Sequence, residues 1–257
     1  MTSDQGLTPA EARAAVARDW GRALDALDGL GDAAASTPTR CAGWTVTDLA
    51  RHGAWGTSME ADALWRARTG TPGTAEGREP SGGPGAVAAA LRASVTELDA
   101  ELAHAADLAP DAVLTIPFGA IPAPFGLCVF TMEAGVHADD LVAACGRDEP
   151  WGEDVVRATA TVLPPVFPVL AGAGGGAPPP EGTVIALRGP TVDLRLGLLD
   201  GTWQPAPDED PTASVTGADD TAVLRFALGR TGPDDPRLAF DGESDLAMSF
   251  KRWFPGP

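Results

Sequence analysis

Four segments in the first 145 residues carry apolar side chains at the three-to-four-residue spacing of an amphipathic helix. They lie in residues 7–30, 44–70, 85–106 and about 125–145. Two of them open with a helix-start signal, in which Thr8 is followed by Pro9 and Glu11, and Thr45 by Asp48 in place of the usual Glu. Four such helices predict an N-terminal four-helix bundle, in which side chains of facing helices can build a site in the core.

The pattern changes at a run of glycine and proline that is expected to be a linker. Before it, a shorter helix is expected over residues 153–169, interrupted by Pro164 and Pro165. After it, "TVIALRG" and "VDLRLGL" alternate like β-strands, whereas "DDTAVLRFALGR" and "SDLAMSFKRWF" have helical spacing. The predicted organisation is a helical domain over 1–170, a linker over 171–182 and a small α+β domain over 183–257.

Charge and composition limit the partners of the chain. Its 257 residues have a formal net charge of -18, which argues against nucleic acid or an anionic membrane as a partner. The start is polar and acidic, unlike a signal peptide, and no apolar run approaches the roughly 20 residues that span a bilayer. The three cysteines show no CxxC spacing, which fits reduced thiols. We therefore expect a soluble cytoplasmic protein, whose oligomeric state the sequence does not indicate.

The fourth helical segment contains a carboxylate and an imidazole among apolar residues. Glu133 and His137 are four positions apart, so a helix places both on one face. Burial of an unpaired carboxylate is costly, and a metal ion would relieve that cost. His52 is expected on the inner face of the second helix, and two imidazoles with one carboxylate suit zinc or a similar divalent ion. The alternative is a buried polar cluster or a helix-surface pair, because no short motif identifies a metal site here.

Two segments resemble the signature of the DinB and maleylpyruvate isomerase superfamily. The first, "TPTRCAGWTVTDLARHG", has a Cys-x-Gly-Trp-Thr-Val stretch followed by a helical histidine, and the second, "EAGVHADDLVAACG", has Glu-x-x-x-His followed by Asp-Leu. Further along, "ADDTAVLRFALGR" and "LAFDGESDLAMSF" resemble the small domain of mycothiol-dependent maleylpyruvate isomerases. The resemblance covers nearly the whole chain. It implies a DinB-like four-helix bundle followed by a small, sterol-carrier-like α+β domain.

The resemblance also implies a set of ligands. A divalent metal, zinc by preference, would be bound by His52, Glu133 and His137. The implied thiol cofactor is mycothiol, and the GC-rich type of composition, with a single lysine, agrees with an actinobacterial source. A metal-bound thiol is deprotonated at neutral pH and is a strong nucleophile. In such isomerases the thiolate adds to an activated cis double bond, and rotation and elimination then give the trans product.

Some residues outside this metal set have two interpretations. Arg230 matches an arginine implicated in activity in the family, so we predict a catalytic and cofactor-binding role in pairing with a carboxylate of substrate or thiol. Its alternative role is that of a surface arginine at a helix C-terminus, and Arg225 is the less favoured substitute. Cys41 is expected to be structural, whereas Trp55 and Met59 are expected to line the pocket or to pack in the core.

Three kinds of function follow from these observations. The first is a metal- and mycothiol-dependent enzyme that acts on a small unsaturated keto acid or electrophile, as a cis–trans isomerase or a thiol transferase. The second is a thiol-independent metalloenzyme of a biosynthetic pathway, in which the metal is a Lewis acid. The third is a non-catalytic metal-binding protein. The absence of tyrosine and the proline-rich stretch before the fourth helix depart from the family and leave the substrate open.

Overall fold

The structure is a computed structural model that describes residues 6–171 and 177–255. The chain divides into two compact units, residues 1–158 and 159–257. Unit 1 is mainly helical and unit 2 contains a mixed β-sheet with short helices, which confirms the predicted fold class. The division falls inside a helix, earlier than the predicted domain end at residue 170. Part of the predicted linker, residues 172–176, lies outside the described residues, so the domain limits stay a prediction.

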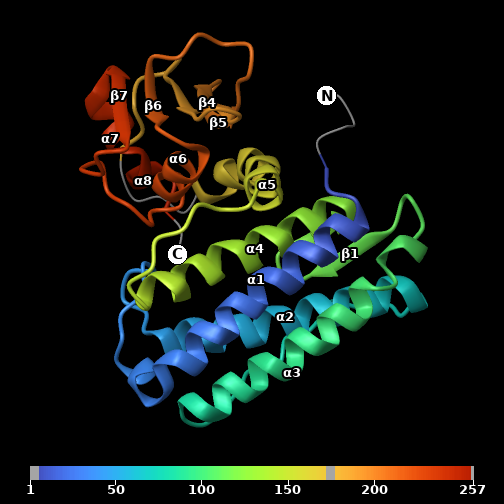
Figure 1. The fold of residues 1–257 in the computed structure, drawn as a ribbon. Helices are drawn as coiled ribbons and strands as arrows, with labels where there is room; N and C mark the ends of the chain where they lie inside the picture. Colours follow the sequence, from blue (N-terminus) through green and yellow to red (C-terminus); the bar gives the residue numbers. More distant parts are fainter. Residues whose placement is uncertain (1–5, 172–176, 256–257) are drawn as a thin grey trace. The chain divides into compact units, whose positions relative to one another are not determined.

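Unit 1 is built around the four predicted long helices (Figure 1). These are α1 (Pro9–Leu30), α2 (Val46–Thr69), α3 (Pro84–Leu102) and α4 (Ala123–Ala144), with 3-10 turns at Gly31–Ala35 and Ala105–Asp107. Helix α1 packs against α3 and α4, and α2 packs against the same two helices, so the four helices close into a bundle. The third helix ends earlier than predicted, because residues 105–107 form a separate 3-10 turn.

Capping boxes fix the first turns of α1 and α2, as the sequence predicts. The Thr8 hydroxyl accepts a hydrogen bond from the Glu11 backbone at 3.2 Å, and the Glu11 carboxylate accepts one from the Thr8 backbone at 2.8 Å. Thr45 and Asp48 make the same pair of bonds at 3.2 and 3.0 Å. Each box satisfies two backbone donors that the helix itself leaves free. The start of α2 is therefore fixed less than two turns before His52.

A two-stranded hairpin precedes α4 where the sequence suggested only a proline-rich turn. Strands β1 (Val113–Ile116) and β2 (Gly119–Pro122) are antiparallel. Leu114 is fully buried and lies against Gly126 of α4, where an added methyl group would be 2.5 Å from the Leu114 side chain. The hairpin packs on α2 and α4, so its stability comes from burial and not from a strong strand signal.

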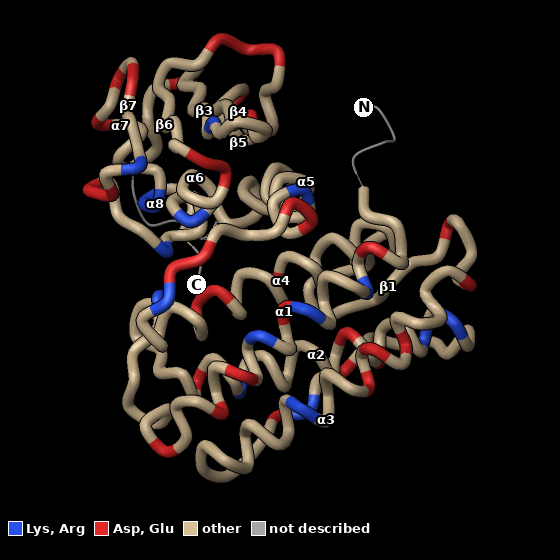
Figure 2. The backbone as a smooth tube through the Cα atoms, in the orientation of Figure 1, with Lys and Arg blue, Asp and Glu red and all other residues tan. Residues whose placement is uncertain are grey.

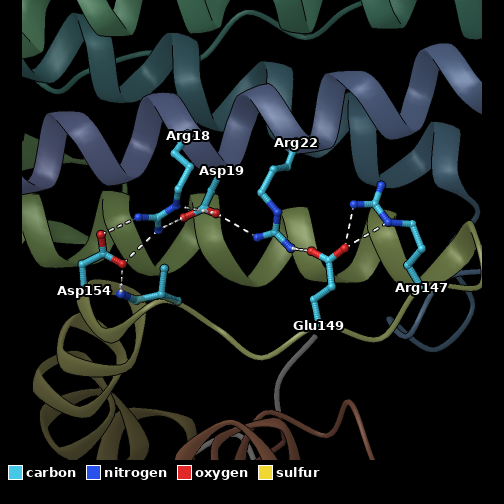
Figure 3. Close-up of polar contacts among 7 residues, drawn as sticks. Arg18, Asp19, Arg22, Arg147, Glu149 and Asp154 are labelled. Carbon is cyan, nitrogen blue, oxygen red and sulfur yellow. Dashed lines mark hydrogen bonds and ion pairs between the residues drawn. The ribbon is translucent and has the colours of Figure 1, made fainter.

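A network of ion pairs joins α1 to the segment after α4 (Figure 3). Asp19 is almost fully buried and accepts hydrogen bonds from Arg18 at 2.5 Å and Arg22 at 2.9 Å. Arg18 also binds Asp154 at 2.6 Å, and Arg22 binds Glu149 at 2.7 Å. Because each arginine contacts two carboxylates, the buried charge of Asp19 is compensated and the segment after α4 is tied to α1.

Unit 2 contains a five-stranded sheet in the order β5-β4-β3-β6-β7. Its strands are β3 (Val184–Arg188), β4 (Asp193–Leu199), β5 (Thr202–Pro205), β6 (Ala213–Gly217) and β7 (Leu238–Gly242). Strands β3 and β6 pair in parallel and the other pairs are antiparallel. Helix α6 (Asp220–Ala227) packs on β3 and β6. The predicted final helix is broken at Ser249 into α7 (Ser244–Met248) and α8 (Phe250–Trp253).

Helix α5 (Glu153–Ala171) continues through its prolines, so the predicted interruption at Pro164 and Pro165 is wrong. Proline fits the helical φ angle, and packing offsets the lost hydrogen bonds. In unit 2 its Phe167 ring lies 5.2 Å from the rings of Phe250 and Phe254. Among the described residues, α5 alone is long and apolar enough to cross a membrane, which is weak evidence because core helices meet the same criterion.

Acidic residues dominate the charge of both units (Figure 2). The chain has 36 Asp and Glu against 18 Lys and Arg, and the basic positions are scattered among acidic ones. A field of this sign attracts cations and repels polyanions. The predicted absence of a nucleic-acid partner stays a prediction.

Candidate metal centre

Two helices of unit 1 bring the three predicted metal ligands together. His52 comes from α2, and Glu133 and His137 come from α4. His137 Nε2 lies 3.1 Å from Glu133 Oε2, and His52 Nε2 lies 3.7 Å from the same oxygen. One ligand atom from each residue lies within 4.8 Å of the other two. Ligands at about 2.1 Å from a tetrahedral zinc ion are about 3.4 Å apart, so this set fits a divalent ion.

Two glycines beside the ligand positions allow close packing of neighbouring side chains. Gly53, the residue after His52, leaves room for the Trp20 side chain of α1, because a methyl group there would be 2.8 Å from the Trp20 ring. On α4, Gly135 leaves room for Val155 in the first part of α5, where a methyl group would be 2.4 Å from that side chain. The helices that carry the predicted ligands are therefore tightly packed next to His52 and between Glu133 and His137.

The three side chains differ in exposure. His137 retains 6% of its side-chain exposure, whereas His52 retains 31% and Glu133 retains 34%. One ligand is therefore buried in the bundle and the other two reach solvent. An ion at this site would have protein on one side and an open side for a small molecule, which is the arrangement of catalytic and not of structural metal sites.

A second carboxylate supports the buried histidine. Asp140 Oδ2 lies 3.4 Å from His137 Nδ1 and accepts a hydrogen bond from Cys41 Sγ at 3.2 Å. A carboxylate on Nδ1 favours the tautomer in which Nε2 is free to bind a metal. Asp140 was not identified from the sequence, although the spacing His-x-x-Asp in "HADD" places it on the same helix face. Cys41 is buried here, and its structural role stays a prediction.

The acid–base behaviour of the pair reflects mutual stabilisation. Burial alone would raise the pKa of Glu133, but its hydrogen bonds with His137 and His52 hold that pKa well below the usual range. Burial alone would lower the pKa of His137, but its bonds to Asp140, Cys41 and Glu133 raise that pKa well above the usual range. Without a metal, the site therefore favours a positive charge between its carboxylates. A divalent cation would supply that charge directly.

Another buried carboxyl group is close enough to Glu133 and His137 to interact with their charges. Glu60 of α2 is 3% exposed, and its Oε2 atom has no hydrogen-bond partner among the described residues. Burial and the charge of Glu133 both raise the pKa of Glu60 well above its usual range. A cation bound nearby would favour the ionised form. Glu60 was not singled out from the sequence, where it lies in "SMEADAL" close to another acidic residue, Asp62.

The arginines predicted to assist the site belong to unit 2. Arg230 follows α6, is largely buried and donates a hydrogen bond to the Leu228 carbonyl at 3.0 Å. This contact agrees with the alternative role of Arg230 at a helix C-terminus. That alternative placed the side chain on the surface, whereas it is largely buried. Arg225 is also buried. The predicted action of Arg230 at the metal site stays a prediction.

The other predicted side chains lie as follows. His104 is exposed and lies 3.4 Å from Asp107, so it takes no part in the site. Met59 is 7% exposed and packs in the core. Trp55 is half-buried, with its ring 6.2 Å from that of His52. Of the two aromatic or sulfur-containing candidates, Trp55 alone lines a cleft beside the triad.

Comparison with known proteins adds a family and a fold. The profile of the mycothiol maleylpyruvate isomerase N-terminal domain matches residues 6–142, which is more than half of the chain. The crystal structure of the mycothiol-dependent maleylpyruvate isomerase is similar, with a TM-score of 0.66 and 19% identity. A histidine-to-alanine mutant of that enzyme gives a TM-score of 0.67 and 20% identity. Each comparison covers 94% of this chain and 96% of the other. No curated protein sequence matches the chain.

Proposed function

We propose, from the premise that this chain belongs to the mycothiol maleylpyruvate isomerase family, that it is a metal- and mycothiol-dependent cis–trans isomerase of a small unsaturated keto acid. One observation carries the proposal. His52, Glu133 and His137 form a compact donor triangle with an open side, inside the stretch that the family profile matches. A non-catalytic metal protein would have no need of that open side.

In this proposal, each residue of the site has its own role. His52, Glu133 and His137 would hold the divalent ion, preferably zinc. When both are bound, the metal would lower the pKa of the mycothiol thiol and the thiolate would supply a nucleophile that adds reversibly to an activated cis double bond. Through its contact with Nδ1, Asp140 would favour the His137 tautomer whose Nε2 is free to hold the ion. The exposed sides of His52 and Glu133 leave room for the thiol and the substrate.

Arg230 is proposed to bind a carboxylate of the substrate or the thiol. A guanidinium offers two parallel N–H donors that match the geometry of a carboxylate. An anionic keto acid needs such a partner, because the protein has a strong negative charge overall. We further propose that the enzyme works in the cytoplasm, where its three free cysteines stay reduced.

Metal content is the first test. Wild-type protein purified without a histidine tag is reconstituted with zinc, dialysed and measured by plasma mass spectrometry, together with His52→Ala and Glu133→Ala. We expect about one ion per wild-type chain and its loss in both variants. His104→Ala is the matched control, since His104 is exposed and remote from the triad, and it should retain the ion.

Turnover is the second test, on the same samples. Loss of maleylpyruvate absorbance should require both the metal and added mycothiol. Turnover with metal and without mycothiol would favour the thiol-independent metalloenzyme, and formation of a stable thiol adduct would favour a transferase. A metal-bearing protein that is inactive with every thiol tested would favour the non-catalytic alternative. A wild type that stays metal-free would overturn the proposal.

A further inference from the structure

A cleft of about 510 Å³ opens beside the metal triad in unit 1. That volume lies within the usual range for sites that bind small molecules. The cleft is formed by the loop before α2, the first turns of α2 and the loop that follows α2. The side chains that line it include Trp44, Asp48, Arg51, His52, Trp55 and Glu79.

Two indole rings flank the metal-facing imidazole at the edge of this cleft. The His52 ring lies 5.2 Å from the Trp44 ring and 6.2 Å from the Trp55 ring, measured between centroids. Both tryptophans are half-buried, so part of each ring faces the cleft. Of the three triad residues, His52 lines this cleft. A molecule that packs on the two indole rings would therefore lie against the His52 imidazole.

The far wall of the cleft is held firmly against Trp55. The Arg78 backbone donates a hydrogen bond to the Ser58 hydroxyl at 2.8 Å. Gly77 lies so close to Trp55 that an added methyl group would be 2.5 Å from the indole nitrogen. These contacts fix the loop that carries Glu79. Because these contacts lie within the protein, they hold the wall in place, which limits the entropy lost on binding.

The charges of the cleft discriminate between the two ligands of the proposed reaction. Asp48 and Glu79 supply two carboxylates, whereas Arg51 supplies one guanidinium, which already lies 3.5 Å from Asp48. A dicarboxylate substrate would meet a net negative charge here and be disfavoured. A neutral polyol can donate hydroxyl hydrogens to carboxylates and place its C–H faces on indole rings. The surroundings of Trp44 and Trp55 therefore suit a sugar better than an acid.

We propose that this cleft binds the neutral, polyhydroxylated sugar–inositol part of the thiol cofactor, with Trp44 and Trp55 as packing faces and the thiol directed past His52. The inference rests on the proposed function, since it assigns a place to the thiol in that reaction. The carboxylated substrate would then bind at a different part of the exposed side of the triad, outside this cleft.

Binding to cobalt-loaded protein tests the assignment without turnover. Cobalt replaces zinc, and the near-ultraviolet absorption of a cobalt–thiolate bond reports thiol binding. The two probes are mycothiol and N-acetylcysteine methylamide, which lacks the sugars. We expect mycothiol to bind at least about tenfold more tightly, which is about 1.4 kcal/mol, because its rings would pack on two indole rings. Trp55→Leu should remove most of that advantage and leave the affinity for the small thiol unchanged. Equal affinities of wild type for the two thiols, or equal weakening of both by Trp55→Leu, would overturn the assignment.

Two further variants accompany Trp55→Leu, one as a control for folding and one as a second test of the cleft. Trp65→Leu changes an indole on the same helix that is 39% exposed and outside the cleft, so it should bind both thiols as wild type does. Glu79→Gln changes an exposed residue and should weaken mycothiol alone, by about threefold for one hydrogen bond to a charged acceptor that becomes neutral.

A metal-free measurement separates failure of this inference from failure of the proposed function. Mycothiol is titrated into metal-free protein while tryptophan fluorescence is recorded. A response that Trp55→Leu abolishes, without any cobalt–thiolate absorption, would keep the cleft and reject the thiolate function. Cobalt–thiolate absorption with no dependence on Trp55 or Glu79 would keep the function and reject the cleft. Displacement of mycothiol by maleate from the metal-free protein would also reject it.

Discussion

At the scale of single residues, Asp140 is expected to favour the His137 tautomer that can bind a metal. Its carboxylate lies 3.4 Å from Nδ1 of the imidazole, on the side away from Glu133. We expect Asp140→Asn to lower zinc affinity by about 10- to 100-fold, since the amide no longer holds the required tautomer. Competition with a chromophoric chelator measures the affinity. Asp62→Asn, which breaks an ion pair with Arg66 on α2, is the control and should keep wild-type affinity. Equal affinities for all three proteins would contradict the role of Asp140.

Lys251 carries the clearest pH dependence of a single residue. Burial, together with the charge of Arg230, lowers the pKa of Lys251 from 10.5 to about 8. Between these values the unfolded chain binds more protons than the folded chain, so stability rises with pH from about 8 to 10.5. Below pH 8 the buried Lys251 amine is protonated in the folded protein, so the full cost of burying its charge lowers the stability.

We therefore expect Lys251→Met to stabilise unit 2 at pH 7, by about 1 kcal/mol after allowance for partial solvent screening. The gain should shrink as pH rises from 8 to 10.5. Urea unfolding followed by tryptophan fluorescence at pH 7 and 9.5 measures the difference. Arg252→Gln, at the exposed neighbouring position, should show no such pH dependence. A gain from Lys251→Met that is the same at both pH values would disprove the assignment.

At the scale of elements, two glycines of α2 should respond oppositely to the same substitution. Gly53→Ala places a methyl group 2.8 Å from the Trp20 ring and 3.3 Å from Leu91, whereas Gly56 has nothing within 4 Å. We expect Gly53→Ala to lower the free energy of unfolding by about 1–3 kcal/mol through overpacking. Gly56→Ala should raise it by up to about 1 kcal/mol through helix propensity. Urea unfolding measures both, and a change of the same sign in the two variants would refute the packing argument.

The elements also show where local sequence is a sufficient guide. Helices α1 and α2 begin at their predicted caps, because the capping residues lie within three positions of each other. Strand β6 was not predicted, since "ASVTG" has a weak strand pattern and pairs in parallel with β3, far back in the chain. The β1–β2 hairpin was not predicted either, since each of its strands has only four residues and the segment is rich in proline. Prolines misled the prediction for α5, where packing keeps the helix intact.

At the scale of the whole molecule, a metal bound by α2 and α4 should stabilise unit 1. The three predicted ligands come from two helices and are brought together only by folding. A ligand of the folded state adds about 4 kcal/mol when it is present at about 1,000 times its dissociation constant. We expect the thermal unfolding midpoint to rise with zinc and to return to its metal-free value with a chelator. In His52→Ala, zinc should have no such effect, and a zinc-dependent rise in that variant would show that the ion binds elsewhere.

The sequence alone predicted the helical first unit and the α+β second unit, and it singled out His52, Glu133 and His137, whose side chains the fold brings together. Helix caps, apolar periodicity and the four-residue spacing on α4 are local properties. They can therefore be recognised from residues that are close together in the sequence. Only the tertiary structure placed Asp140, Glu60 and the Trp44–Trp55 cleft around that triad. Their roles depend on which helix faces lie in contact. That is decided by close packing at positions such as Gly53 and by burial of residues far apart in the chain.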